Sequence, residues 1–178
     1  MESEPFLQQA AEEHPYPLVF AALSGAHLYG FPSEDSDFDI RGVHVLPATE
    51  VVGLRTGSET VQYPDDRDGH LIDLVTHDVR KFCKLLLKRN GYVLEQLYSP
   101  LVIHTSQEHA ELKEIALGCI TRNHVHHYAG FADNEWRLFE RSDRKDLKLL
   151  LYVFRVLMTG IHLMRTGEVE GLLAESGG

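Results

Sequence analysis

The stretch SGAHLYGFPSEDSDFDIRGV, from Ser24 to Val43, decides the fold and the site that we predict for this chain. It opens with a glycine turn after an apolar run and closes in an alternating, strand-like segment that carries Asp37 and Asp39. Side chains two residues apart on a strand point to the same face. The two carboxylates therefore repel each other unless a positive group lies between them, and a divalent metal ion is the obvious candidate.

A third carboxylate follows in the apolar segment LIDLV, where Asp73 needs a partner because desolvating a carboxylate is costly. If the strands expected at residues 38–46 and 70–76 share a sheet, Asp37, Asp39 and Asp73 can converge on one face. Three carboxylates suit two Mg²⁺ ions about 3.5–4 Å apart, which activate an attacking hydroxyl and stabilise a leaving pyrophosphate. The alternative is a solvated DSDFD turn with Asp73 facing water at a strand edge.

The segment from Gly25 to Gly30 precedes these carboxylates by about a dozen residues. Glycines let a backbone approach phosphates closely and direct its N–H groups at them, so this segment is a candidate phosphate cradle. Arg41 shares the strand face of Asp39. Its guanidinium either meets a phosphate or forms an ion pair with Asp37 or Asp39.

The wider pattern predicts an α/β fold, a small mixed sheet with helices followed by a helical subdomain. Strands are expected at residues 18–23, 38–46, 56–63 and 70–76, with a hairpin turn at PDDRDG and a short strand or extended link at 101–103. A short helix is expected up to about His14. From Val79 the period changes to helical and predicts helices at about 79–89, 93–98, 107–119, 122–140 and 145–165. We therefore divide the chain into an α/β domain, residues 1–104, and a C-terminal helical subdomain, residues 105–178.

The composition limits the partners. The 178 residues carry a formal net charge of −10, from 27 acidic and 17 basic side chains, which disfavours general coating of nucleic acid but leaves room for a local basic groove. The N-terminus is acidic and unlike a signal peptide, and no apolar run approaches about 20 residues. These features predict a cytoplasmic protein that does not engage a membrane, and they leave its oligomeric state open.

The Gly turn, the Asp-x-Asp pair and the later Asp together resemble the signature of the DNA polymerase beta-like nucleotidyltransferase superfamily, in which a Gly-Ser turn comes first. The segments YG…SDFDIRGV and VRKFCKLLLKRNGYVLEQLYSP are most similar to small bacterial nucleotidyltransferases described as an RNA-repair-pathway, or RNA-ligase-associated, family. The resemblance covers residues 18–98 well. It extends more loosely through the helical part to Lys148, Tyr152, Arg155 and the MRTGEV ending.

The resemblance implies transfer of a nucleoside monophosphate from an NTP to a hydroxyl, with two Mg²⁺ or Mn²⁺ ions as cofactors and an RNA 3′ end as the favoured acceptor. Asp37, Asp39 and Asp73 would be the catalytic metal ligands, with Asp73 helping to deprotonate the acceptor. The expected nucleotide-binding residues are Gly25, Ala26, Tyr29, Arg41, Lys81, Lys148 and Arg155. Nucleotidylation of a small molecule or protein, and a non-catalytic nucleotide- or RNA-binding module, remain as alternatives.

One departure from the family pattern concerns the turn. The family's Gly-Ser aligns with Gly25-Ala26, so the hydroxyl that would contact a phosphate is absent and only the backbone amides remain. Lys148 and Arg155 are seven residues apart on one helix face, where they bind phosphate or form salt bridges. The basic face of the helix that begins at Val79 binds triphosphate or RNA, or is simply solvated; its residues are Arg80, Lys81, Lys84, Lys88 and Arg89.

Overall fold

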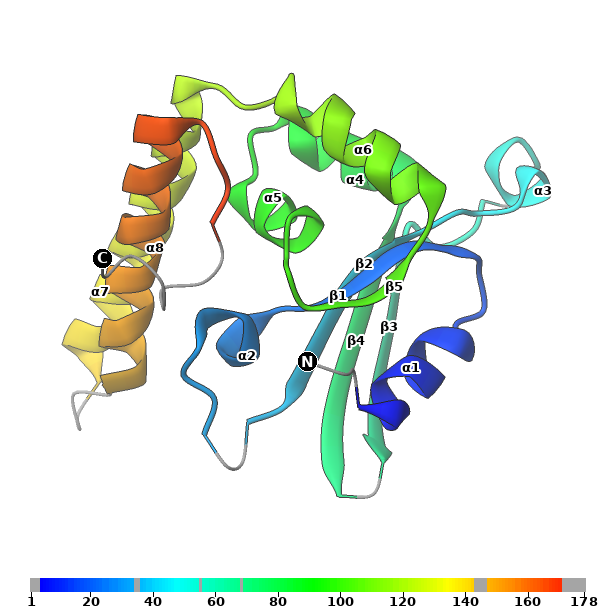
Figure 1. Ribbon diagram of the computed structural model, residues 1–178, viewed down its shortest axis with the longest axis horizontal. Helices are drawn as coiled ribbons and strands as arrows, with labels where there is room; N and C mark the ends of the chain where they lie inside the picture. The colour runs from blue at the N-terminus through cyan, green and yellow to red at the C-terminus, as the bar shows by residue number, and fades with distance from the viewer. Residues whose placement is uncertain (1–3, 34–35, 55, 68, 143–146, 171–178) are drawn as a thin grey trace.

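The computed structural model of the protein has a five-stranded mixed sheet with helices on both faces (Figure 1). It describes residues 4–33, 36–54, 56–67, 69–142 and 147–170. The strands are β1 (Leu18–Leu23), β2 (Phe38–His44), β3 (Thr60–Arg67), β4 (His70–Asp78) and β5 (Val102–Thr105). The helices are α1 (Pro5–Glu12), α2 (Gly25–Tyr29), α3 (Ala48–Val51), α4 (Val79–Leu87), α5 (Gly91–Leu97), α6 (Gln107–Leu117), the 3₁₀ turn η1 (Arg122–His124), α7 (Val125–Arg141) and α8 (Leu147–Thr166).

The strand order is β3-β4-β2-β1-β5, and β2 with β4 forms the parallel pair while the other neighbours are antiparallel. A parallel pair needs a crossover between its strands, which α3 and β3 supply here. The apolar strand β1 lies inside the sheet and is buried from Val19 onward. This topology places the strand of the Asp-x-Asp segment directly beside the strand of Asp73.

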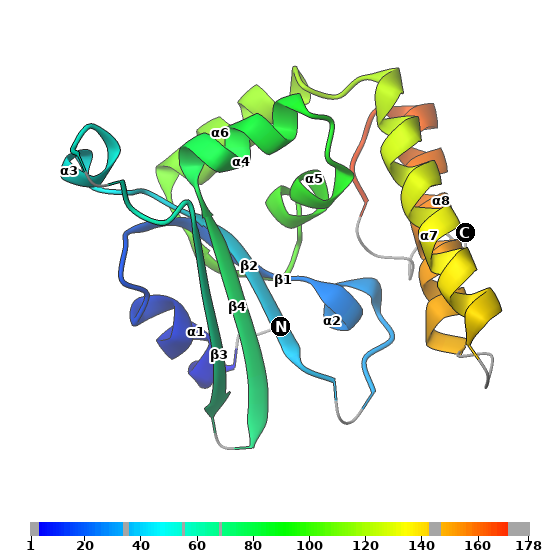
Figure 2. The same ribbon diagram turned by 180° about the vertical axis from the view of Figure 1, so that it is seen from behind.

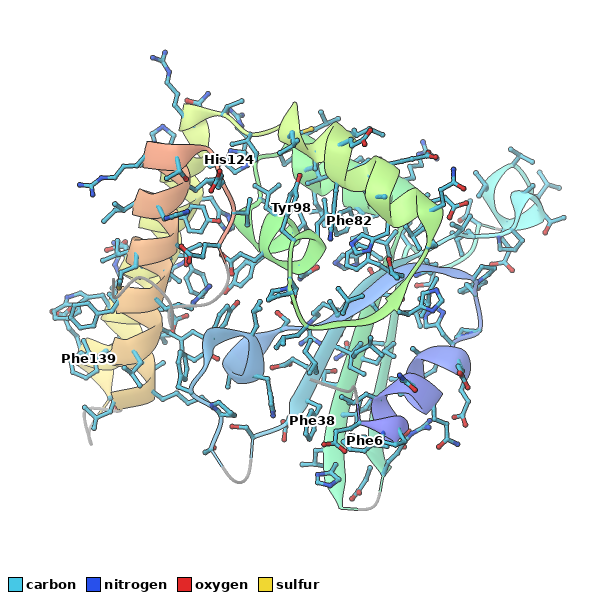
Figure 3. All side chains as sticks on the ribbon, viewed as in Figure 1. Phe6, Phe38, Phe82, Tyr98, His124 and Phe139 are labelled. Carbon is cyan, nitrogen blue, oxygen red and sulfur yellow. The ribbon has the colours of Figure 1, made fainter. Side chains whose placement is uncertain are left out.

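Side chains alternate between two differently covered faces of the sheet. Ile40, Ile72 and Leu74 pack with α1 on one face, whereas Val43 belongs to the larger apolar core formed with the helices from α4 onward. Phe38 also turns to the α1 side, where its ring meets that of Phe6 edge-on at 5.2 Å (Figure 3). Because Phe38 is held on that face, its neighbour Asp39 points to the opposite one.

Side-chain caps fix where the helices after the sheet begin. Asp78 accepts a hydrogen bond from the Arg80 amide at the start of α4, and Asn90 accepts one from the Tyr92 amide at the start of α5. A cap of this kind contributes about 1 kcal/mol. Asp78 also accepts from the backbone N–H of Leu46, so the same carboxylate joins the segment that follows β2 to the start of α4.

Helices α7 and α8 lie side by side next to α2, as both views show (Figures 1 and 2). The predicted division after residue 104 falls at the end of β5. One apolar cluster nevertheless runs from Val19 in the sheet to Leu163 in α8, so the two parts share a core. The division into domains stays a prediction.

The α/β fold class is confirmed, and the element bounds differ from the prediction mainly in the hairpin. We expected a strand at 56–63 and a turn at PDDRDG, but β3 starts at Thr60 and continues through Pro64 to Arg67. Pro64 is tolerated because β3 is an edge strand. Gly69, with φ of +83°, adopts the left-handed conformation before β4 begins.

Among the described residues, α8 is the one helix long and apolar enough to cross a membrane by length and composition. We expected no apolar run that approaches about 20 residues. Lys148 and Arg155 lie within this helix. One third of its most apolar window is buried inside the protein, including the charged Arg155. The absence of a membrane partner and the cytoplasmic location stay predictions.

Candidate active site

Asp39 and Asp73 are direct partners in the parallel pairing of β2 with β4. Parallel strands in register carry paired residues on the same face, so the two carboxylates lie next to each other. Each side chain is about one third exposed, at 31% for Asp39 and 32% for Asp73. The expected convergence of these two aspartates on one face is therefore present.

Arg41 lies between the two carboxylates. Its Nη2 donates to Asp39 Oδ1 at 2.7 Å and to Asp73 Oδ2 at 2.8 Å. Its Nη1 donates to the backbone carbonyls of Asp73, at 2.5 Å, and of Ile40, at 3.0 Å. Arg41 therefore forms the ion pair with Asp39 that we gave as the alternative to phosphate binding, and it forms a second ion pair with Asp73.

Gly25 abuts the carboxylate of Asp39. A Cβ atom at position 25 would lie 2.0 Å from Asp39 Oδ2, and the φ angle of Gly25 is +60°. The Ser24 amide donates to the Asp39 carbonyl at 2.8 Å, which continues the pairing of β1 with β2 into this turn. Glycine is required here both by the left-handed backbone and by the close approach.

The electrostatics of the site reflect crowded negative charge. Burial raises the pKa of Asp39 above its ordinary value, the charges of Asp73 and Asp37 raise it further, and Arg41 opposes them. Asp37 is exposed where the chain enters β2, and its charge acts on Asp39. A carboxylate destabilised in this way gains from a second cation nearby.

The donor set fits a divalent cation in part. One guanidinium nitrogen already contacts an oxygen of Asp39 and an oxygen of Asp73, so a single cation at that position would contact both. Oxygen donors are the ligands that Mg²⁺ and Mn²⁺ prefer. Within the described ranges, no three His, Cys, Asp or Glu side chains are already gathered closely enough to hold a metal ion. Asp37 would have to turn toward the pair to complete the predicted set.

Arg155, expected to bind phosphate, forms a buried ion pair instead. Its Nη1 donates to Glu95 Oε2 at 2.6 Å, and the two side chains are 1% and 2% exposed. The guanidinium lies 3.7 Å from the centre of the Tyr29 ring, and the Tyr29 hydroxyl donates to the same Glu95 oxygen. Arg155 and Tyr29 therefore tie α8, α5 and α2 together, and we leave them out of the proposed phosphate contacts.

The other residues predicted to bind the nucleotide are Ala26, Lys81 and Lys148, and they lie on three different helices. Ala26 is buried in α2, directly after Gly25. Lys81 at the start of α4 donates to Thr60 Oγ1. Lys148 is exposed in the first turn of α8, one turn before Tyr152. Burial and then the charge of Asp39 raise the pKa of Tyr152, which indicates that α8 faces the site.

Sequence reasoning missed two polar residues on this face. Gln62 Nε2 donates to Asp73 Oδ1 at 3.1 Å. His77 lies two positions beyond Val75, the strand partner of Arg41, and burial followed by the charges of Lys81, His44 and Arg41 lowers its pKa to about 4. Period-two spacing from Asp73 could have found His77, whereas Gln62 required the true register of the hairpin.

Comparison with known proteins gives the family. The sequence model of the RNA repair pathway DNA polymerase beta family, RlaP, matches residues 3–176. The chain belongs to this family. The matched residues include the Gly25 turn, the Asp39–Asp73 pair and the helices that follow. The resemblance to polymerase beta-like nucleotidyltransferases seen in the sequence is therefore confirmed.

Two relatives of this RlaP family member are described as uncharacterized proteins. The protein MJ0002 of Methanocaldococcus jannaschii is 33% identical over 152 residues, and YcgL of Bacillus subtilis is 25% identical over 165 residues. These alignments cover 85% and 92% of the chain but 62% of each relative, so the chain spans about three fifths of their length. A solved nucleotidyltransferase-like protein from Exiguobacterium sibiricum aligns with a TM-score of 0.45 at 10% identity, over 92% of this chain and 57% of that one.

Proposed function

We propose that this protein is a metal-dependent nucleotidyltransferase that moves a nucleoside monophosphate from an NTP to an acceptor hydroxyl. The observation that carries the proposal is the in-register Asp39–Asp73 pair beside the close-packed Gly25 backbone, in a chain of the RlaP family. Two adjacent carboxylates repel each other unless a cation lies between them. Arg41 supplies that positive charge in this structure, and we propose that divalent ions supply it during the reaction.

The roles of the residues follow from their positions. Asp39 and Asp73 would hold the divalent ions, Mg²⁺ or Mn²⁺, with Asp37 as the third ligand. When bound, such ions polarise the α-phosphate and neutralise charge on the leaving pyrophosphate. Asp73 is the proposed acceptor of the proton from the attacking hydroxyl. Its second oxygen is oriented by Gln62, which keeps the carboxylate in place for that role.

Phosphate contacts are proposed for the backbone of Gly25 and Ala26 and for the side chains of Arg41, Lys81 and Lys148. The charges of Lys81 and Arg41 both lower the pKa of His77. Lys81 and His77 both contact Thr60 Oγ1, and Arg41 pairs with Val75, two residues before His77, so these groups lie on the same part of the sheet. A polyphosphate placed there would meet positive charge beyond the carboxylates. Positioning and charge neutralisation of this kind supply most of the catalysis in phosphoryl-type transfers.

The proposed acceptor is an RNA 3′ hydroxyl, which the family's RNA-repair description supports. The net charge of −10 means that RNA would have to contact a local basic surface. The exposed side chains of Arg80 in α4 and of Lys88 directly after it offer positive charge, while Lys84 is partly neutralised by Glu59 at 3.4 Å.

A transfer assay tests the proposal. The protein is incubated with Mn²⁺ or Mg²⁺, each of the four α-labelled NTPs, and a short RNA ending in a 3′ hydroxyl or in a 3′ deoxynucleotide. We expect label on the first RNA only, and its loss in Asp39→Asn. Label on the protein itself or on a small-molecule panel, with unlabelled RNA, would assign a different acceptor. Nucleotide binding without transfer to any acceptor would favour the non-catalytic module.

A further inference from the structure

Arg41 does not merely lie near the proposed metal ligands; it occupies the position between them. Its Nη2 contacts Asp39 Oδ1 and Asp73 Oδ2, and its Nη1 contacts two backbone carbonyls, so four acceptors share one guanidinium. Mg²⁺ binds carboxylate oxygens at about 2.0–2.1 Å, well inside the 2.7 and 2.8 Å of these hydrogen bonds. The guanidinium and such an ion therefore exclude each other from this position.

We propose that Arg41 is a resident counter-cation that a divalent ion displaces, and that the displaced guanidinium then binds the triphosphate of the incoming nucleotide. This inference rests on the proposed function. Without Arg41, two carboxylates on adjacent strands would face each other, and Gln62 would still donate to Asp73 Oδ1. Arg41 offsets that repulsion, and in doing so it competes with the metal ion.

The surroundings of Arg41 allow its guanidinium to move away from the carboxylates. The side chain is 21% exposed, and His77 lies on the same sheet face, two residues beyond Val75, the strand partner of Arg41. Thr60 Oγ1 contacts both His77 Nδ1, at 3.1 Å, and the ammonium of Lys81, so Lys81 lies next to that ring. A polyanion beside Lys81 would attract the guanidinium away from the carboxylates, because Arg matches phosphate geometry with two N–H donors. Metal ion and nucleotide would then each favour the binding of the other.

The competition predicts a gain of metal affinity when Arg41 is removed. Mn²⁺ binding is measured by electron paramagnetic resonance with no nucleotide present. We expect Arg41→Gln to bind Mn²⁺ about tenfold more tightly than the unmodified protein, in the range of ordinary coupling between sites. The rise in Mn²⁺ affinity caused by a non-hydrolysable NTP should be smaller in Arg41→Gln than in the unmodified protein.

The protein offers a matched control. Arg67 also contacts two carboxylates, Asp65 at 2.6 Å and Glu13 at 2.5 Å, but it lies on the α1 face of the sheet. Arg67→Gln changes the net charge by the same amount and should leave Mn²⁺ affinity unchanged. Arg41→Lys keeps the charge but replaces the guanidinium fork with a single ammonium. Its Mn²⁺ affinity should therefore lie between that of the unmodified protein and that of Arg41→Gln.

The outcomes separate this inference from the proposed function. If Arg41→Gln binds Mn²⁺ no more tightly than Arg67→Gln while the unmodified protein transfers label, the counter-cation role is wrong and the transferase stands. If no protein binds Mn²⁺, with or without nucleotide, both fail. If Arg41→Gln folds poorly, the Mn²⁺ affinity of Arg41→Lys is compared with that of the unmodified protein instead. Equal Mn²⁺ affinity in these two proteins would contradict the displacement of Arg41 by the metal ion.

Discussion

Asp39 and Asp73 lie directly opposite each other on β2 and β4, and one nitrogen of Arg41 contacts both carboxylates. The pairing depends on register, because a slip of one residue would turn either side chain to the α1 face among Ile40, Ile72 and Leu74. The buried apolar residues that alternate with the aspartates therefore fix the site as well as the core.

Substitution of Gly25 by alanine should disrupt this arrangement. The new Cβ would lie 2.0 Å from Asp39 Oδ2 on a backbone with φ of +60°, so either the turn or the carboxylate must move. We expect label transfer to fall at least about 100-fold, as when a positioned catalytic donor is lost.

Gly30→Ala is the matched control for that change. Gly30 also has a left-handed φ, of +80°, but a Cβ added there would have no atom within 4 Å. It should lower the free energy of unfolding by about 1 kcal/mol and leave transfer intact. Equal transfer by Gly25→Ala and Gly30→Ala would show that the close approach to Asp39 is unimportant.

Loss of Arg155 should destabilise the junction of α2, α5 and α8. Arg155→Met leaves Glu95 buried at 2% exposure with its charge unpaired, which costs about 3–5 kcal/mol of unfolding free energy. Urea unfolding measures the change. Arg137→Met, in the exposed pair with Asp133 on α7, should cost no more than about 0.5 kcal/mol. Similar values for the two variants would contradict the buried-pair assignment.

Acid should weaken the fold through its neutral histidines. Burial lowers the pKa of His77 to about 4, and it also lowers the pKa of His14 and His44, whose rings share the Thr76 hydroxyl. A pKa below that of the unfolded chain means that the neutral ring favours folding. This stabilisation is complete above the ordinary value of 6.5 and is lost as the pH falls toward the folded-state value.

The urea midpoint should therefore stay level from about pH 7.5 to 6.5 and decline between about 6.5 and 4.5. His77→Gln should decline less steeply over the same interval. A midpoint that does not change with pH, or an identical decline in His77→Gln, would show that these rings do not carry the acid sensitivity.

The sequence was sufficient for the features that rest on local pattern. Alternation in the segments around Asp39 and Asp73 predicted two strands with carboxylates on one face, and helical periodicity predicted the order of α4 to α8. The hairpin bounds were wrong because Pro and Asp are turn residues by composition, yet an edge strand tolerates both.

Contacts between segments that are distant in the chain could not be predicted from the sequence. Arg155 reads equally well as a phosphate ligand or an ion-pair partner until Glu95, 60 residues earlier, is placed beside it. The same holds for Gln62, whose bond to Asp73 depends on the register of β3 with β4. Composition and hydrophobic periodicity predict which face of an element a side chain occupies, but not which residues it contacts.

The most direct test of the central claim is label transfer by Asp73→Asn compared with Asp65→Asn, under Mn²⁺ and with the NTP and RNA that the unmodified protein uses best. Asp65 lies on the same hairpin but faces α1, where it pairs with Arg67. We predict that Asp73→Asn lowers the transfer rate at least about 100-fold and that Asp65→Asn transfers at the unmodified rate. Transfer by Asp73→Asn at the unmodified rate would contradict the assignment of the Asp39–Asp73 pair as the catalytic centre.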